Sequence, residues 1–348
     1  MRFMNARTNL VLLAAAAALA AFILGVERRR ESTEGRLDRQ RRAFAFAPER
    51  VASLRIETSA TAIALEREDD RWWLVEPVRA PADVTEIARI LHGIQSAPRD
   101  AAIPAAGNGG PPVSLRDYGL DRPRARIALS GPDIDLRIEI GEPSALGQLY
   151  VRSLPAGDIL ATGTNLLGIL PPSPSVLRNR TLFPPVSAEV RQLRIRRPGG
   201  FVHLSRGDGG NWRILQPTPG RADRAAVAGL IDGLMSARIA EFVQDGVAEG
   251  APFGLDETAI EVTIDYDRDD VPPVTLQVGR AQDRKPGAVY ARLAGSDTVF
   301  TLPAALALRL TLPPDELRDR RLVPMLPEDV GAFAIEKADR RLRIVREG

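Results

Sequence analysis

The stretch VASLRIETSATAIALEREDDRWWLVEPVRAPAD (51–83) has a partner later in the chain, VRQLRIRRPGGFVHLSRGDGGNWRILQPTPGRAD (190–223). Three landmarks recur at an offset of 140 residues: Trp72 with Trp212, Pro77 with Pro217, and Asp83 with Asp223. Self-similarity at a fixed offset is the signature of a duplicated supersecondary unit. The sequence therefore predicts one folding unit of about 140 residues that is used twice.

The repeat continues beyond these stretches. DYGLD (117–121) corresponds to PFGLD (252–256), and LRNRTL (177–182) corresponds to LRDRRL (317–322). The stretch VGAFAIEKADRRLRIVREG (330–348) then resumes the opening hairpin for a third time. It is either a partial third repeat or a hairpin that caps the second unit. Two strands alone bury too little apolar surface to be stable in water. We therefore expect four alternating side chains to pack on the second unit: Phe333, Ile335, Leu342 and Ile344.

Each unit has the pattern of an antiparallel sheet with one packed helix. Alternating apolar residues predict paired strands, and a third strand runs through the tryptophan. A helix then begins at Asp83 or Asp223, since aspartate is a favoured N-cap, and Glu86 would complete a capping box in the first unit. The apolar residues that follow have helical spacing: Ile87, Ile90, Leu91 and Ile94 in the first unit, and Val227, Leu230, Ile231 and Leu234 in the second.

A membrane segment is predicted near the N-terminus. From Leu10 to Val26 the chain carries no charge, and as a helix it would span about 26 Å of the roughly 30 Å apolar core of a bilayer. A cleaved signal peptide is the rival interpretation, but the A-x-A sequence at 18–20 lies inside the apolar run. We therefore predict a single-pass anchor in the bacterial inner (cytoplasmic) membrane, with the bulk of the chain extracytoplasmic or periplasmic.

The predicted fold class is α+β, with an N-terminal transmembrane helix followed by tandem repeats that combine a mostly antiparallel sheet with packed helices. The predicted segments are a transmembrane anchor (1–27), a charged juxtamembrane linker (28–46), a first repeat (47–184), a second repeat (185–326), and a partial third repeat or capping hairpin (327–348).

Composition and motifs exclude most familiar chemistry. The 348 residues include no cysteine and two histidines, and the net charge of +2 is too small for a nucleic-acid footprint. No zinc-protease, nucleophile-elbow or P-loop motif occurs. The acidic group Asp265, Asp267, Asp269 and Asp270 begins with the spacing of a calcium loop, but Asp270 stands where such a loop requires glycine. We predict a non-enzyme without a cofactor or a metal site.

Five residues are candidates for binding a partner or an anion. Trp72 and Trp212 share one strand position and should be core residues, whereas Trp73 has no counterpart and is the candidate for exposure. The other candidates are two pairs of arginines in the repeated motif, which would either bind an anion or form salt bridges within their unit: Arg178 and Arg180, and Arg318 and Arg320.

Several motifs together resemble the bacterial domain-of-unknown-function family 4340: the apolar N-terminal helix, the repeated W-x-x-x-x-P strand, the YGLD or FGLD turn and the LR-x-R-x-L motif. The resemblance implies an anchored protein that accompanies a gliding-motility-type ABC transporter. We therefore expect a non-catalytic accessory or scaffold protein with a protein partner in the membrane. The alternative is a cell-envelope protein that binds a polymer or carbohydrate through exposed aromatic and arginine side chains, and an uncharacterised hydrolase is the third hypothesis.

Overall fold

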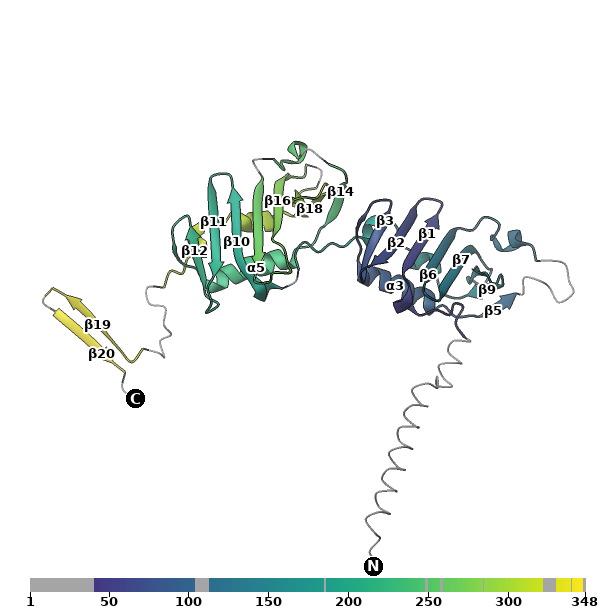
Figure 1. Cartoon of the computed structure of the whole chain (residues 1–348), viewed down its shortest axis with the longest axis horizontal. Helices are drawn as coiled ribbons and strands as arrows, with labels where there is room; N and C mark the ends of the chain where they lie inside the picture. The colour runs from purple at the N-terminus through teal and green to yellow at the C-terminus, as the bar shows by residue number, and fades with distance from the viewer. Residues whose placement is uncertain are drawn as a thin grey trace, which may run out of the picture. The chain divides into compact units, whose positions relative to one another are not determined.

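The computed structural model describes residues 41–103, 113–184, 186–247, 250–256, 259–283, 285–321, 330–338 and 340–346. The chain divides into two compact units, Met1–Asn179 and Arg180–Gly348 (Figure 1). Each unit has its own hydrophobic core, and the two cores share no residue. The repeat seen in the sequence is therefore a repeat of whole folding units.

The first unit consists mainly of strands. In chain order its elements are the short 3-10 helix η1 (Pro48–Arg50), β1 (Ser53–Thr58), β2 (Ala62–Glu68), β3 (Arg71–Glu76), β4 (Ala80–Pro81), α3 (Val84–Gln95), β5 (Ala101–Ile103), η2 (Leu115–Tyr118), β6 (Ala125–Gly131), β7 (Ile134–Pro143), β8 (Leu149–Leu154), β9 (Ile159–Thr162), α4 (Leu166–Ile169) and η3 (Pro174–Leu177).

The second unit repeats this order. Its elements are η4 (Ser187–Glu189), β10 (Val190–Arg197), β11 (Gly200–Arg206), β12 (Trp212–Gln216), β13 (Gly220–Arg221), α5 (Arg224–Ser236), β14 (Glu241–Gln244), η5 (Ala251–Phe253), β15 (Ile260–Tyr266), β16 (Val274–Ala281), β17 (Ala288–Leu293), β18 (Val299–Pro303), α6 (Ala304–Leu310) and η6 (Pro314–Leu317), followed by the hairpin strands β19 (Ala332–Lys337) and β20 (Arg340–Val345).

Each unit folds into one nine-stranded sheet, and the strand order is the same in both. The first sheet has the order β4-β3-β2-β1-β6-β7-β8-β9-β5, and the second has β13-β12-β11-β10-β15-β16-β17-β18-β14. The opening hairpin lies inside the sheet because β1 pairs with both β2 and β6. Its alternating apolar residues therefore meet neighbours on both sides, and Leu54 lies between Leu65 and Leu129.

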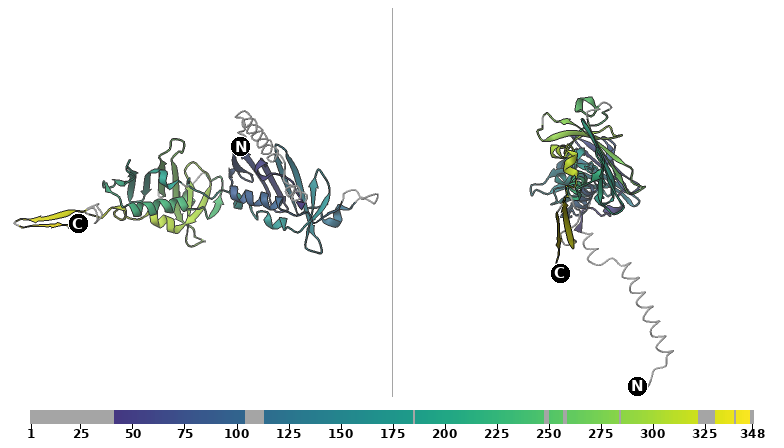
Figure 2. Two further views of the ribbon diagram at one scale, coloured as in Figure 1. Left: turned by 90° about the horizontal axis from the view of Figure 1, so that it is seen from below. Right: turned by 90° about the vertical axis from the view of Figure 1, so that its left-hand side faces the viewer.

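The predicted helix of each unit, α3 or α5, packs on one face of its sheet, and the shorter α4 or α6 joins it in the same core (Figure 2). The Asp83 carboxylate caps α3 by accepting hydrogen bonds from the backbone N–H groups of Thr85 and Glu86. The predicted apolar residues of α3 and α5 are all buried. The predicted capping box is wrong, because the Asp83 N–H donates to the Leu177 carbonyl at 2.7 Å and Glu86 pairs with Arg89.

The repeated YGLD and FGLD segments are tight turns packed on the sheet. Gly119 and Gly254 both have φ near 66°, which favours glycine. Each turn lies against a second glycine, where an added Cβ would come within 2.1 Å of the Tyr118 carbonyl oxygen at Gly141 and within 2.2 Å of the Phe253 oxygen at Gly279. The aromatic residue of each turn packs edge-on against a tyrosine that recurs later in both units: Tyr118 on Tyr150, and Phe253 on Tyr290.

The structure corrects the predicted fold class and localisation. Within the described ranges the longest α-helix, α5, has 13 residues and spans about 20 Å, so no helix there is long and apolar enough to cross a bilayer. The segment Leu10–Val26 lies outside the described residues. The prediction of a transmembrane helix followed by α+β repeats, and of a single-pass inner-membrane protein, is thus replaced by two sheet-dominated repeats with four α-helices among the described residues.

Candidate functional site

The hairpin β19–β20 exposes an apolar face. The strands pair from Ala332 with Val345 to Lys337 with Arg340, which places four alternating side chains on one side. These side chains, which we call the hairpin face, are about half exposed: Phe333 47%, Ile335 56%, Leu342 55% and Ile344 47%. The prediction that they pack on the second unit is therefore wrong.

The same positions are buried in the two complete units. Leu54, Ile56, Ile63 and Leu65 in the first unit, and Leu193, Ile195, Val202 and Leu204 in the second, are all at most 2% exposed. In both units they belong to the core cluster that contains the apolar face of α3 or α5. At the positions that α3 or α5 covers in the two complete units, the side chains of the hairpin face are exposed in the described part of the chain.

The predicted aromatic candidates behave differently from one another. Trp72 and Trp212 are each 8% exposed and lie in the cores, which confirms the prediction for both. Trp73 is half-buried on the opposite face of β3, and the Arg79 guanidinium lies over its ring at 4.9 Å. Arg79 is itself held by a salt bridge of 2.7 Å to Glu68, which lowers the pKa of that carboxyl. One face of the Trp73 ring is therefore already covered.

The first arginine of each repeated motif forms a backbone bridge with the residue before the helix N-cap. Arg178 and Arg318 form isolated bridges with Ala82 and Ala222, immediately before α3 and α5. Arg178 is 5% exposed, and the Arg318 guanidinium donates to the Thr218 carbonyl at 2.8 Å. The short helices η3 and η6 end at Leu177 and Leu317, and the backbone at Arg178 and Arg318 is extended.

The second arginine of each motif also makes contacts within its unit. Arg180 donates to the carbonyls of Ile239 and Ala240 at 3.1 and 2.7 Å, and Arg320 pairs with Glu316 at 3.0 Å. Of the five sequence candidates, Trp73 and Arg178 belong to the first unit and the other three arginines belong to the second.

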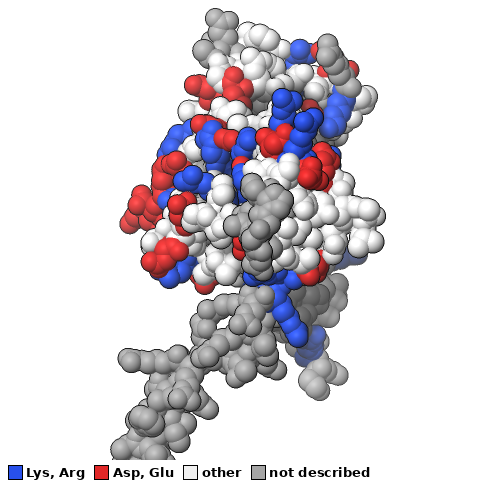
Figure 3. All heavy atoms as spheres, turned by 90° about the vertical axis from the view of Figure 1, so that its right-hand side faces the viewer, with Lys and Arg blue, Asp and Glu red and all other residues white. Residues whose placement is uncertain are grey.

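The faces of the sheets opposite the helices are polar and densely paired. In the second unit a row of side chains crosses four strands: Arg196 bonds Glu261, which accepts from Gln277, which accepts from Arg292. The pKa of Glu261 is lowered, first by the hydrogen bond from Arg196. Figure 3 shows basic and acidic residues interspersed on the side of the molecule that it views. Because these opposite charges neutralise one another, this face of the sheet has little net positive charge to attract a polyanion.

Burial shifts the pKa of two titratable groups in the second unit. The ring Nε2 of His203 lies 3.2 Å from Gln192 Oε1, and burial lowers the pKa of His203. Burial also raises the pKa of Tyr266 to about 12. Within the described part of the chain no three His, Cys, Asp or Glu side chains gather into a possible metal site, and Asp265 accepts two hydrogen bonds from Arg194.

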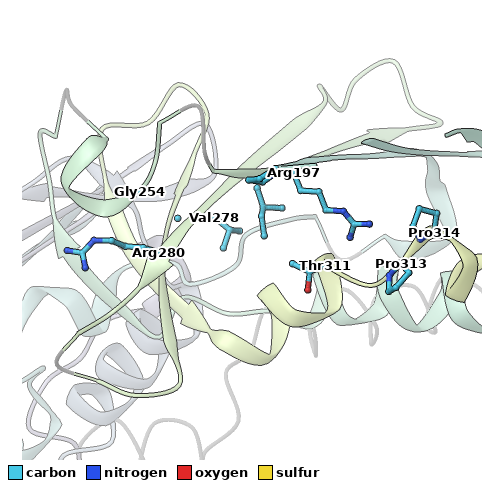
Figure 4. A pocket seen from close by; sticks show the side chains of 10 residues that line it. Arg197, Gly254, Val278, Arg280, Thr311, Pro313 and Pro314 are labelled. Atoms are coloured by element: carbon cyan, nitrogen blue, oxygen red, sulfur yellow. The ribbon is translucent and has the colours of Figure 1, made fainter. Parts of the chain in front are cut away.

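A groove of about 670 Å³ opens in the second unit (Figure 4). Ile260 on β15 and Val278 on β16 form an apolar cross-strand pair within it. Pro198, Thr311, Pro313 and Pro314 also line it, and Arg197 and Arg280 extend in opposite directions. Sequence reasoning missed this groove because its residues come from four separate stretches. The one available signal was Gly254 and Gly279, which the turn geometry requires and which also line the groove.

The comparisons with known proteins identify a family and nothing closer. The chain matches the domain of unknown function DUF4340 twice, over residues 72–220 and 212–348. Each match begins at the strand of a repeated tryptophan and runs through the hairpin that opens the next copy, so the second includes β19 and β20. No curated protein and no solved structure matches the chain. The chain belongs to the DUF4340 family and carries its domain in tandem.

Proposed function

We propose that this chain is a non-catalytic repeat module that binds a protein partner through the hairpin β19–β20. The observation that carries the proposal is the exposure of the hairpin face. Four apolar side chains are 47–56% exposed at positions where both complete units bury the corresponding residues to 2% or less. Exposed apolar clusters of this kind mark protein-interaction surfaces.

The complete units indicate which element would cover this face. There the corresponding residues pack against α3 or α5, whose buried side chains follow helical spacing. Lys337 and Arg340 pair at the end of the hairpin and lie on the same side as this face, whereas Arg341, which pairs with Glu336 at 2.9 Å, lies on the opposite side. The partner element is thus an amphipathic helix with an apolar face and acidic flanks. A second copy of the hairpin fits less well, since it would bring the Lys337 and Arg340 side chains of both copies together.

The identity of the partner follows from the family resemblance and not from geometry. The resemblance implies a role beside an ABC transporter, so we assign the acidic helix to a subunit of an ABC transporter-type complex. The polymer-binding alternative has less support, because the tryptophans are either core residues or, for Trp73, stacked under Arg79.

Site-specific photocrosslinking in intact cells tests the proposal. A photoreactive amino acid at Ile335 lies on the hairpin face, whereas the same group at Ala334 lies on the opposite side of the same strand. We expect one crosslinked product from Ile335, and the same product from Phe333, with little from Ala334.

Mass spectrometry of the crosslinked product should identify a transporter subunit with an acidic amphipathic helix. Equal crosslinking from Ile335 and Ala334, or none from either, would overturn the binding role of the hairpin. A specific product of another kind would overturn the transporter assignment alone.

A further inference from the structure

We propose that the groove in the second unit is a separate binding site for an acidic peptide segment. One apolar side chain of the peptide lies over Ile260 and Val278, and a neighbouring carboxylate binds the Arg197 guanidinium. The site is independent of the hairpin and of the partner proposed for it.

The floor of the groove is an apolar surface that the first unit keeps covered. Ala125 and Ile140 form the corresponding cross-strand pair there, and they are 1% and 0% exposed. In the second unit Val278 is 2% exposed, but Ile260 is only partly buried. The segment that follows the last helix differs in the same way, since Pro171 is buried and its counterpart Thr311 is exposed. The groove is thus a departure from the repeated fold.

The charge of the groove selects an anion. Two arginines and no acidic residue line it. Arg280 is already paired with Asp283 at 2.7 Å, and its Nε donates to the Pro252 carbonyl. Arg197 uses Nη1 alone, for the carbonyls of Leu310 and Leu312 at 2.9 and 2.8 Å.

Within the described residues the Nε and Nη2 groups of Arg197 have no protein acceptor. These two groups form the fork that binds a carboxylate through two parallel hydrogen bonds. The hydrogen bonds from Nη1 hold the side chain beside the end of α6, so the fork is oriented before a ligand arrives.

The rim favours a peptide segment over an enclosed small molecule. Pro198, Thr311 and Pro313 are exposed, so the groove is open along its length. The three prolines of the rim offer no backbone N–H group. A peptide would therefore be held by its side chains, through the apolar floor and the arginine, and not by strand addition.

Fluorescence anisotropy with a labelled hexapeptide of alternating leucine and glutamate tests the site in the full chain. A matched peptide has glutamine in place of glutamate. We expect binding of the glutamate peptide that Arg197→Ala weakens about tenfold or more, the usual effect of losing a charge-assisted pair. Arg196→Ala is the matched control, because Arg196 is the adjacent arginine of β10 and pairs with Glu261 on the opposite face.

A second variant tests the floor without removing an arginine. Thr311→Trp should fill the groove and abolish binding, whereas Leu308→Trp, on an exposed position of α6, should leave it unchanged. The proposal is overturned by failure of the glutamate peptide to bind, by equal binding of the glutamine peptide, or by equal losses in a variant and its control. Binding of decanoate but not of the peptide would also overturn it, in favour of a fatty carboxylate.

Discussion

At the scale of single residues, strand alternation decides which of two neighbouring side chains is buried in the core. Trp72 and Trp73 are adjacent in β3, yet one lies in the core and the other lies under Arg79 on the opposite face. The repeat distinguishes them, because only Trp72 has a counterpart, Trp212. A large aromatic residue that recurs at one strand position indicates that the core of each unit needs it for packing. A residue without a counterpart in the other unit meets no such need.

The first prediction concerns these two residues. Trp72→Ala should lower the free energy of unfolding of its unit by about 3–5 kcal/mol, since it leaves a large cavity in the core. Trp73→Ala should cost much less, because Trp73 is only half-buried and loses mainly its contact with Arg79. Denaturant unfolding of both variants measures the difference, and equal losses would refute the core assignment of Trp72.

The second prediction concerns pH. Burial lowers the pKa of His203 in the folded chain, Arg194 lowers it further, and Asp265 acts in the opposite direction. The unfolded chain therefore binds a proton at His203 more readily than the folded chain does. The contribution of neutral His203 to stability is complete above about pH 6.5 and is lost as the pH falls through the lowered pKa. His203→Gln should flatten this part of the stability profile.

The control for this prediction is His92→Gln, at an exposed position of α3. The His92 variant removes one histidine from the first unit, and its profile serves as the reference for the His203 variant. An unchanged acid slope in the His203 variant would show that other groups set the pH dependence.

At the scale of elements, the hairpin β19–β20 shows how context decides burial. Its apolar alternation is that of β1–β2 and β10–β11, but no element of the described chain covers it, and its side chains are exposed. The same pattern is therefore a core in two places and a surface in the third.

The third prediction is that deletion of residues 330–348 leaves the thermal stability of both units nearly unchanged. The hairpin contributes no residue to either core cluster, so its removal uncovers no core surface. Calorimetry of the shortened chain gives the test. A marked drop in the melting temperature of the second unit would mean that the hairpin packs on it after all.

At the scale of the whole molecule, duplication has given two folding units with separate cores. Each core combines one nine-stranded sheet with the helix that follows its fourth strand. A change inside one core has no route to the other through shared core contacts.

The fourth prediction follows from this separation. Trp212→Ala should lower the melting temperature of the second unit by roughly 10 °C and leave the first unchanged, since Trp212 packs only in the second core. Trp72→Ala should do the converse. Hydrogen exchange resolved along the chain measures both units at once, and parallel losses in the two units would contradict the separation.

The sequence by itself determined the features that depend on local pattern. The offset between Trp72 and Trp212 predicted the repeat, alternation predicted the strands, and Asp83 and Asp223 predicted where the helices begin. These features depend on side-chain periodicity and capping, which act within a few residues. The family motifs became interpretable only with the fold, because the YGLD turn packs on Gly141 of β7, a contact between a turn and a strand that local pattern does not show.

The tertiary structure alone decided what covers each apolar surface. Alternation places Phe333 and Ile335 on one face of a strand, but it does not say whether a helix lies over that face. The groove beside Arg197 has the same origin, since burial of Ile260 depends on where the chain after α6 runs. Burial is set by the elements that surround a residue in space, and these can be distant in the chain, since Arg197 bonds the Leu312 carbonyl 115 residues later.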